Sequence, residues 1–532
     1  MASATATAGG GAAPARPAAS HSVAFVEVPN RGLITLAVMA AMIMQILDMT
    51  IANIALPSMQ NSLGAAQDTI SWVLTSYIVA SAIATPLTGW LSDRLGRKRL
   101  FLSAVVGFVA ASALCGAAQS LDEMVLFRIL QGAFGAALAP LSQAALLDIN
   151  PPSRQGSAMA LWGAGIMIGP VLGPTLGGWL TDVADWRWVF YINLPIGVLA
   201  FFGLSLYLPD TVKRIRRFDL FGFTCLSIGL GAVQLLLDRG QELDWFQSTE
   251  VLVEAGVAIS ALWIFVVHSL TAKEPFIDLA LFRDRNFVSA LAFIFLISTT
   301  LFATMALLPP MMQRLYGYST ITVGLVLAPR GLGTMLSMIL VGRVIQKVDA
   351  RLLMLGGLLF VSTAVWQMTG FSPEMTSTPF IVSGIIQGLG FGFVFMPLNM
   401  LAFTTLAPRL RTEAASVFSL VRNIGSAIGI SIMVSTLAGS LQINHAELGE
   451  RINIFRQMPV GSPITSAALA AGDPVTMTQL DGLISQQSAF LAYLDDFKLM
   501  LIVTLATGPL LLLLRRPKRG PPAGAPQPMA AD

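Results

Sequence analysis

The stretch from Leu33 to Leu56 is 24 residues long, and Asp48 is its only ionisable residue. At a rise of about 1.5 Å per residue, a helix of this length crosses a hydrocarbon core of about 30 Å. The stretch is too long for the apolar core of a signal peptide, and no apolar run precedes it. It therefore predicts a transmembrane helix that stays in the membrane.

Thirteen more apolar runs follow, so we expect an all-α polytopic membrane protein with about 14 transmembrane helices. The composition agrees, because 11% of the 532 residues are charged, against about 25% in soluble chains. The expected helices span residues 33–56, 70–91, 99–119, 123–147, 156–180, 189–208, 219–237, 249–270, 287–310, 321–345, 352–369, 379–406, 413–438 and 497–514.

Basic residues orient these helices. With a cytoplasmic N-terminus, 23 of the 32 Lys and Arg residues fall in the tails and inner loops and five in outer loops. Because cytoplasmic loops carry the excess of positive charge, both termini are predicted to be cytoplasmic. A lipid bilayer is expected to surround these helices.

An internal repeat at a spacing of roughly 255 residues divides the chain into halves. Ile129-Leu130-Gln131-Gly132 corresponds to Ile385-Ile386-Gln387-Gly388, and Pro140 corresponds to Pro397. The expected organisation is a disordered cytoplasmic tail (1–32), a six-helix bundle (33–208), an inserted helix pair with linkers (209–286), a second six-helix bundle (287–514) with a long periplasmic loop (439–496), and a cytoplasmic tail (515–532).

Asp48 is the strongest candidate for function. An ionised carboxylate deep in a span costs on the order of 3 kcal/mol and marks proton or cation handling by default. Arg128 lies at a similar depth in the fourth predicted helix, since the two differ by about 5 Å along the membrane normal. A direct or water-bridged pair is feasible, in which Arg128 would stabilise Asp48 when ionised.

Gly89-Trp90-Leu91-Ser92-Asp93-Arg94-Leu95-Gly96-Arg97-Lys98 connects the second and third predicted helices. Gly89 and Gly96 allow close helix approach and a tight turn, and Asp93 can accept hydrogen bonds from a helix N-terminus or pair with an arginine. The segment resembles the corresponding loop of the major facilitator superfamily, which implies the major facilitator fold of two six-helix bundles. It suits a latch that forms and breaks between conformations.

The fifth predicted helix is dense in small residues, with Gly169, Pro170, Gly173, Pro174 and Gly177 in sequence order. Small residues let helix backbones touch, and each proline bends its helix. The alternative is a helix that is merely tightly packed. The run resembles the motif that marks exporters rather than importers within the superfamily.

Together with Trp186–Gly197 and the Asp48 segment, these motifs are similar to those of the fourteen-helix drug:proton antiporters. Leu237–Phe246 further resembles the EmrB-type permeases. The resemblance implies export of hydrophobic drugs or toxic compounds in exchange for protons, by alternating access. It also implies location in the cell inner membrane and a periplasmic membrane-fusion adaptor as a partner. Export of one metabolite or siderophore, or import on the same fold, is the alternative.

Other intramembrane polar residues are candidates for lining a cavity or joining helices. They are Gln45, Asn53, Gln131, Gln387, Asn399 and Arg422. Three histidines without ligand-like spacing and two cysteines within apolar stretches indicate neither a metal site nor a disulfide framework. An enzyme, a cofactor other than the proton as coupling ion, and a nucleic-acid partner are not expected.

Overall fold

The computed structural model describes residues 28–66, 69–211, 213, 217–241, 243–345, 347–451 and 474–514. Most of both predicted tails and the middle of the predicted outer loop lie outside these residues. Within them the chain is all-α, and no strand occurs. This confirms the predicted fold class.

Eleven helices within the described residues are long and apolar enough to cross a membrane, and the bent pair α2 and α3 adds a twelfth. In addition, α7 has 32 residues and α19 has 33, and they occupy the positions of the fifth and fourteenth predicted spans. The count is therefore consistent with about 14 spans.

The first half of the chain forms α1 (Arg31–Leu63), α2 (Trp72–Ala84), α3 (Leu87–Leu95), α4 (Arg97–Ala117), α5 (Leu121–Gly135), α6 (Leu138–Ile149), α7 (Pro152–Val183), α8 (Trp188–Tyr191) and α9 (Asn193–Tyr207). The helices α10 (Leu220–Arg239) and α11 (Thr249–Thr271), with the short helix η1 (Trp245–Gln247) between them, follow. The second half forms α12 (Ala280–Arg283), α13 (Arg285–Tyr316), α14 (Thr320–Val344), α15 (Ala350–Met368), α16 (Thr378–Thr404), η2 (Pro408–Leu410), α17 (Arg411–Arg451), α19 (Pro474–Ala506) and η3 (Gly508–Leu512).

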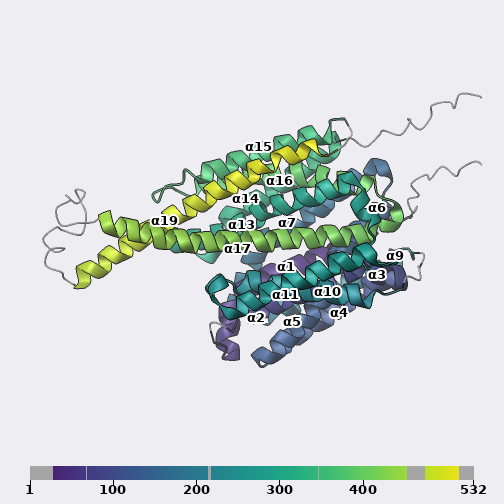
Figure 1. The fold of residues 1–532 in the computed structure, drawn as a ribbon, viewed down its shortest axis with the longest axis horizontal. Helices are drawn as coiled ribbons and strands as arrows, with labels where there is room; N and C mark the ends of the chain where they lie inside the picture. The colour runs from purple at the N-terminus through teal and green to yellow at the C-terminus, as the bar shows by residue number, and fades with distance from the viewer. Residues whose placement is uncertain are drawn as a thin grey trace, which may run out of the picture.

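The helices gather into two groups with α17 along their boundary (Figure 1). In the first group, α1 packs against α7 and α9, and α2 packs against α5. In the second, α14 and α15 both pack against α16. α10 and α11 pack together, and α10 lies against α2. The groups meet mainly where α7 contacts α14 and α16, so α7 contacts both halves.

Prolines explain how several spans are broken or bent. The second predicted span divides into α2 and α3, which meet at an angle of 57° next to Pro86. A proline lacks the backbone N–H of a helical hydrogen bond and clashes with the preceding turn. The fourth span is likewise broken between α5 and α6, a few residues before Pro140.

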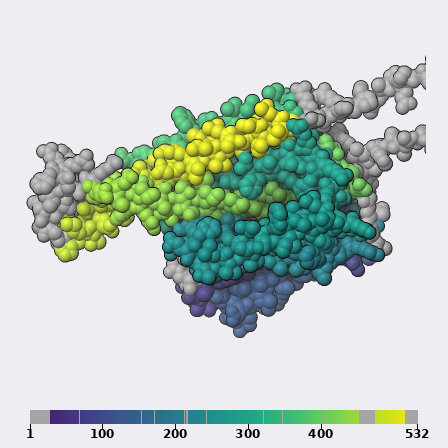
Figure 2. Space-filling model, viewed as in Figure 1, coloured from purple at the N-terminus to yellow at the C-terminus, as the bar shows by residue number. Residues whose placement is uncertain are grey.

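The predicted outer loop at 439–496 is wrong at both ends. α17 continues to Arg451 and α19 begins at Pro474, so both flanks of that segment are helical. The two helices pack on each other, and His445 Nε2 lies 3.1 Å from Asp481 Oδ1. Apolar runs mark where a helix leaves lipid, whereas a polar helix can continue into water when a neighbour supports it. Figures 1 and 2 show the ends of α17 and α19 projecting beyond the other helices.

Candidate functional site

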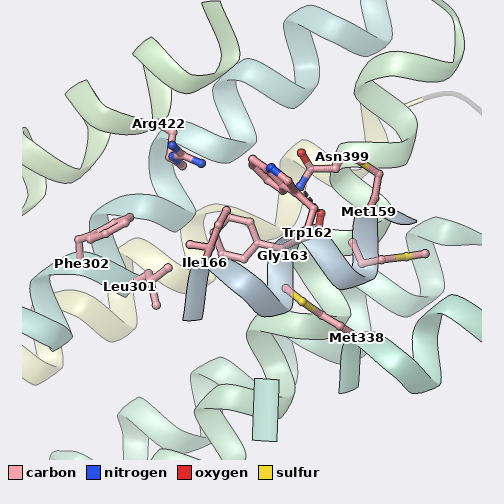
Figure 3. Close-up of a pocket in the computed structure, with 11 residues that line it drawn as sticks. Met159, Trp162, Gly163, Ile166, Leu301, Phe302, Met338, Asn399 and Arg422 are labelled. Atoms are coloured by element: carbon pink, nitrogen blue, oxygen red, sulfur yellow. Dashed lines mark hydrogen bonds between the residues drawn. The ribbon is translucent and has the colours of Figure 1, made fainter. Parts of the chain in front are cut away.

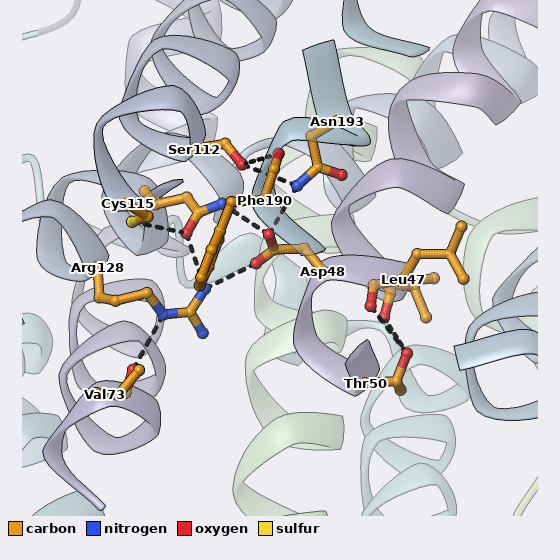
Figure 4. A network of polar contacts seen from close by, with 11 residues as sticks. Leu47, Asp48, Thr50, Val73, Ser112, Cys115, Arg128, Phe190 and Asn193 are labelled. Atoms are coloured by element: carbon orange, nitrogen blue, oxygen red, sulfur yellow. Dashed lines mark hydrogen bonds and ion pairs between the residues drawn. The ribbon is translucent and has the colours of Figure 1, made fainter. Parts of the chain in front are cut away.

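Asp48 is fully buried in α1 and receives three hydrogen bonds from side chains on two other helices. Arg128 Nη1 of α5 donates to Oδ2 at 2.8 Å. Gln131 Nε2 of α5 donates to Oδ1 at 2.8 Å, and Asn193 Nδ2 of α9 donates to the same oxygen at 2.7 Å. Figure 4 shows Arg128 and Asn193 pointing toward the Asp48 carboxylate. The structure thus brings Asp48, Arg128 and Gln131, all named from the sequence, into one cluster.

Arg128 is also buried, and its guanidinium is held on several sides. Its Nε donates to the backbone oxygen of Val73 at 3.0 Å, and its Nη1 also donates to Gln131 Oε1 at 2.8 Å. Its Cζ lies 4.3 Å from the centre of the Tyr77 ring, a distance at which a cation interacts favourably with an aromatic face. While Asp48 is ionised, these contacts and the ion pair together hold the guanidinium of Arg128 in place.

A close approach of two helices makes this geometry available. A Cβ built on Gly132 would lie 2.4 Å from the backbone oxygen of Tyr77, so only glycine fits at that point. With the backbones of α5 and α2 in contact there, Arg128, one turn before Gly132, reaches the carbonyl of Val73, one turn before Tyr77.

Asn193 and Ser112 complete the cluster, and sequence reasoning did not single them out. Asn193 Nδ2 also lies 2.9 Å from Ser112 Oγ, which donates to the backbone oxygen of Phe190 at 2.8 Å. Asn193 did carry a signal, because it is an amide inside the apolar segment Trp188–Tyr207. Ser112 carried none, since a serine in an apolar helix is common.

The cluster can hold a negative charge or a proton. The ionised carboxylate has three donors and a counter-charge, which is what a buried charge needs. A proton placed on Asp48 would remove the ion pair and free Arg128 to change its contacts. Protonation and a change in helix contacts can therefore be linked at this point.

The small-residue face of α7 packs on α1, the helix that carries Asp48. A Cβ on Gly169 would meet Ile46, one on Gly173 would meet Thr50 Oγ1 at 2.3 Å, and one on Gly177 would meet Ile51 at 3.0 Å. Thr50 Oγ1 also donates to the backbone oxygen of Gly169 at 3.2 Å. The side chains of Pro170 and Pro174 lie outside the described part of the structure. The three glycines let α7 fit closely along α1.

The predicted latch lies at the end of the molecule that carries the turn at Gly96, which we call the latch end. Gly96 has φ of +86°, a conformation that favours glycine. A Cβ on Gly89 of α3 would lie 3.1 Å from Glu413 Cα at the start of α17. Asp93 lies in the last turn of α3 and Lys98 in the first turn of α4. The latch segment therefore contacts the opposite half.

An ion-pair bridge that sequence reasoning missed closes the latch end. Arg97 Nη1 pairs with Asp148 Oδ2 of α6 at 2.5 Å, and Arg411 Nη1 of α17 pairs with Asp148 Oδ1 at 3.0 Å. Arg97 Nη2 also donates to Thr412 Oγ1 at 3.2 Å. Asp148 thus joins a cation of the first half to one of the second.

A narrow, mostly apolar pocket lies between the halves (Figure 3). Its walls come from α7, α13, α14, α16 and α17, and they include Trp162, Met338, Asn399 and Arg422. Asn399 Oδ1 accepts from Gln143 Nε2 of α6 at 2.7 Å, which links the two halves next to the pocket.

The other predicted cavity residues lie elsewhere. Gln387 Nε2 donates to Thr304 Oγ1 at 3.3 Å within the second half. Gln45 is half-buried in α1, and Asn53 is exposed on the same helix. The structure therefore places Asn399 and Arg422 at the pocket and Gln131 at the Asp48 cluster, but not the remaining three.

Comparison with known proteins identifies the family. Residues 38–430 match the family model described as Major Facilitator Superfamily. The chain belongs to this superfamily. Its relatives include the multidrug export protein EmrB of Escherichia coli K12, 36% identical with 86% of this chain and 89% of EmrB covered. The fatty acid resistance protein FarB of Neisseria gonorrhoeae is 34% identical, with 91% and 96% covered.

Within the superfamily the chain is an EmrB-type permease, since the match to EmrB extends over most of both proteins. Solved structures share the fold at low identity. The human organic anion transporter MFSD10 superposes with a TM-score of 0.58 at 16% identity, covering 90% of this chain and 100% of MFSD10. The proton:xylose symporter XylE superposes with a TM-score of 0.57 at 13% identity.

Proposed function

We propose that this EmrB-type permease exports hydrophobic toxic compounds across the inner membrane in exchange for protons, by alternating access. The observation that carries the proposal is the buried cluster around Asp48, whose carboxylate holds one charged and two neutral donors. The relatives named multidrug export protein and fatty acid resistance protein support the export direction.

Asp48 carries the proton, and Arg128 is its counter-charge. Substrate and proton then compete indirectly, because each favours a different arrangement of the two halves. The glycine face of α7 supports this role, since α7 packs on the proton-site helix α1 and also on α14 of the opposite half. A shift of α1 on protonation is thus passed to the interface between the halves.

Export of a single metabolite or a siderophore is the second candidate, and import on the same fold is the third. The breadth of the substrate range separates the first two. Inverted vesicles that contain the permease should accumulate several unrelated hydrophobic compounds when their lumen, which corresponds to the periplasm, is made acidic, and accumulation should stop when this proton gradient is collapsed. Accumulation of one compound alone would favour the metabolite exporter, and depletion of the vesicles would favour import.

A periplasmic adaptor of the membrane-fusion class is the proposed partner. Both termini are taken as cytoplasmic from the excess of basic residues in the inner loops. The outer docking surface includes the segment from Asp238 to Asp244, in which Asp238 and Asp244 are exposed. Hydrophobic compounds released at the membrane surface would re-enter the bilayer, so an adaptor prevents futile cycling.

Crosslinking of the tagged permease in intact cells tests the partner. Capture of a membrane-fusion protein, together with lost resistance when its gene is deleted, is the expected result. Capture of permease copies alone with unchanged resistance would show that the protein acts by itself.

A further inference from the structure

The pocket between the halves carries hydrogen-bond donors that lack acceptors. Arg422 Nε and Trp162 Nε1 are both buried without a hydrogen-bond partner among the described residues. Both side chains line the pocket, Arg422 from α17 and Trp162 from α7 (Figure 3). Two unpaired donors in one apolar space call for a ligand that accepts hydrogen bonds.

The described lining of the pocket carries positive charge and no negative charge. Arg422 is the one ionisable side chain among the described lining residues, and no Asp or Glu is present there. The third polar lining residue, Asn399, is already engaged at both ends of its amide. Its Oδ1 accepts from Gln143 Nε2 at 2.7 Å, and its Nδ2 donates to the Phe395 backbone oxygen at 2.7 Å.

The remaining wall is apolar and adaptable. It includes Met159, Met338 and Met396 together with Phe302 and Phe395. Methionine side chains are flexible and polarisable, so they can fit apolar bodies of different shape. A guanidinium in such surroundings is costly unless an opposite charge accompanies it.

We propose that this pocket binds amphipathic organic anions, with Arg422 as counter-charge and Trp162 as a second donor. The ligand class is a carboxylate, sulfonate or ionised phenol joined to an apolar body. This inference rests on the proposed export function and supplies its substrate class. A cation of the same shape is disfavoured, because it would meet the unpaired charge of Arg422 and find no acid.

The position of the two donors gives the anion a mechanical role. Trp162 belongs to the first half and Arg422 to the second, so one bound anion contacts both halves. A ligand that bridges two bodies shifts the equilibrium toward the arrangement in which both contacts form. Binding of the anion therefore changes the relative position of the halves.

The test uses two probes with one apolar body and opposite charge, pyrenebutyrate and pyrenebutyltrimethylammonium. Binding to the full chain in nanodiscs is measured by equilibrium titration, with empty nanodiscs subtracted. The wild type should prefer the anion. Arg422→Gln should lose about tenfold in anion affinity, the order expected for a charged hydrogen bond, without a comparable loss for the cation.

Three further variants make the result specific. Arg422→Lys should keep part of the anion preference, because the charge remains. Trp162→Phe should lower the affinity for the anion several-fold, because it removes the N–H donor and keeps an aromatic ring. Arg343→Gln removes an equal charge from an exposed site on α14 and should leave the preference unchanged.

A wild type that prefers the cation, or an Arg422→Gln variant that keeps the full anion preference, would overturn the proposal. A transport measurement distinguishes failure of the anion site from failure of the proposed export function. If the preference holds but a proton gradient drives no export of pyrenebutyrate, the anion site stands and the proposed export function fails. If both probes are exported equally by wild type and Arg422→Gln, export stands and the anion site fails.

Discussion

Asp48 and Arg128 are 80 positions apart in the chain, yet their side chains meet at 2.8 Å inside the first bundle. Their similar depth in the membrane could be predicted from sequence, because depth follows from counting residues along two helices. The face on which each side chain lies could not, since it depends on helix packing. Asn193 could not be singled out from the sequence either. Its contact with Asp48, which only the structure shows, distinguishes it from other amides in apolar segments.

Arg128→Gln should destabilise the fold more than loss of both charges together. Removing one partner of a buried ion pair leaves an unpaired buried charge, at a cost of about 3–5 kcal/mol. In the double variant Asp48→Asn/Arg128→Gln that charge is gone, so thermal unfolding in detergent should show partial recovery relative to Arg128→Gln. Strictly additive losses would show that the two residues do not act as a pair.

At the scale of elements, apolar runs predicted the spans but not the helices that leave the membrane. The extensions of α17 and α19 are polar, so the hydropathy signal ends while the helices continue. The latch motif was recognisable from its glycines and charges. Its partner Asp148 was not, because the bridge depends on how α6 and α17 meet at the latch end.

The contact of α7 with α1 predicts opposite effects for two neighbouring glycines. Gly173→Ala would place a Cβ 2.3 Å from Thr50 Oγ1, so the helices must separate, at a cost of about 1–3 kcal/mol. Gly178→Ala meets nothing within 4 Å and should be neutral or stabilising by about 0.5–1 kcal/mol. Thermal unfolding of both variants measures the difference, and equal stability would contradict the close packing.

The latch end should open when its charges are removed. Asp148→Asn breaks the bridge between Arg97 and Arg411, and Asp93→Asn weakens the same region, so both should shift the population toward an inward-open state. Spin labels on α3 and on the first turns of α17 report the shift as longer distances. Asp122→Asn, an exposed acid at the opposite end of the first bundle, serves as the control. Unchanged distances in Asp148→Asn would rule out the bridge as a latch.

At the scale of the whole molecule, the two halves carry different charged groups. The described carboxylate cluster with a buried arginine lies in the first half, whereas Arg422 of the second half lines the pocket between them. Ile129–Gly132 of the first half resembles Ile385–Gly388 of the second, but Arg128 precedes the first of these segments and Gly384 the second, so the charged groups of the halves differ. α7 contacts both halves and lies against the helix of Asp48. A proton and a substrate can therefore act on one interface without touching each other.

The measurement that tests this account most directly is substrate-induced proton release from proteoliposomes that contain the Asp48→Asn variant. Asparagine keeps the size of the side chain, but it replaces one acceptor oxygen with a donor amide group and cannot exchange a proton at neutral pH. The variant leaves Arg128 without its counter-charge, so it should unfold at a lower temperature than the wild type. It should still insert, bind substrate and release no protons, while Asp122→Asn should behave as wild type. Proton release at the wild-type level from Asp48→Asn would remove Asp48 from the mechanism and contradict the account.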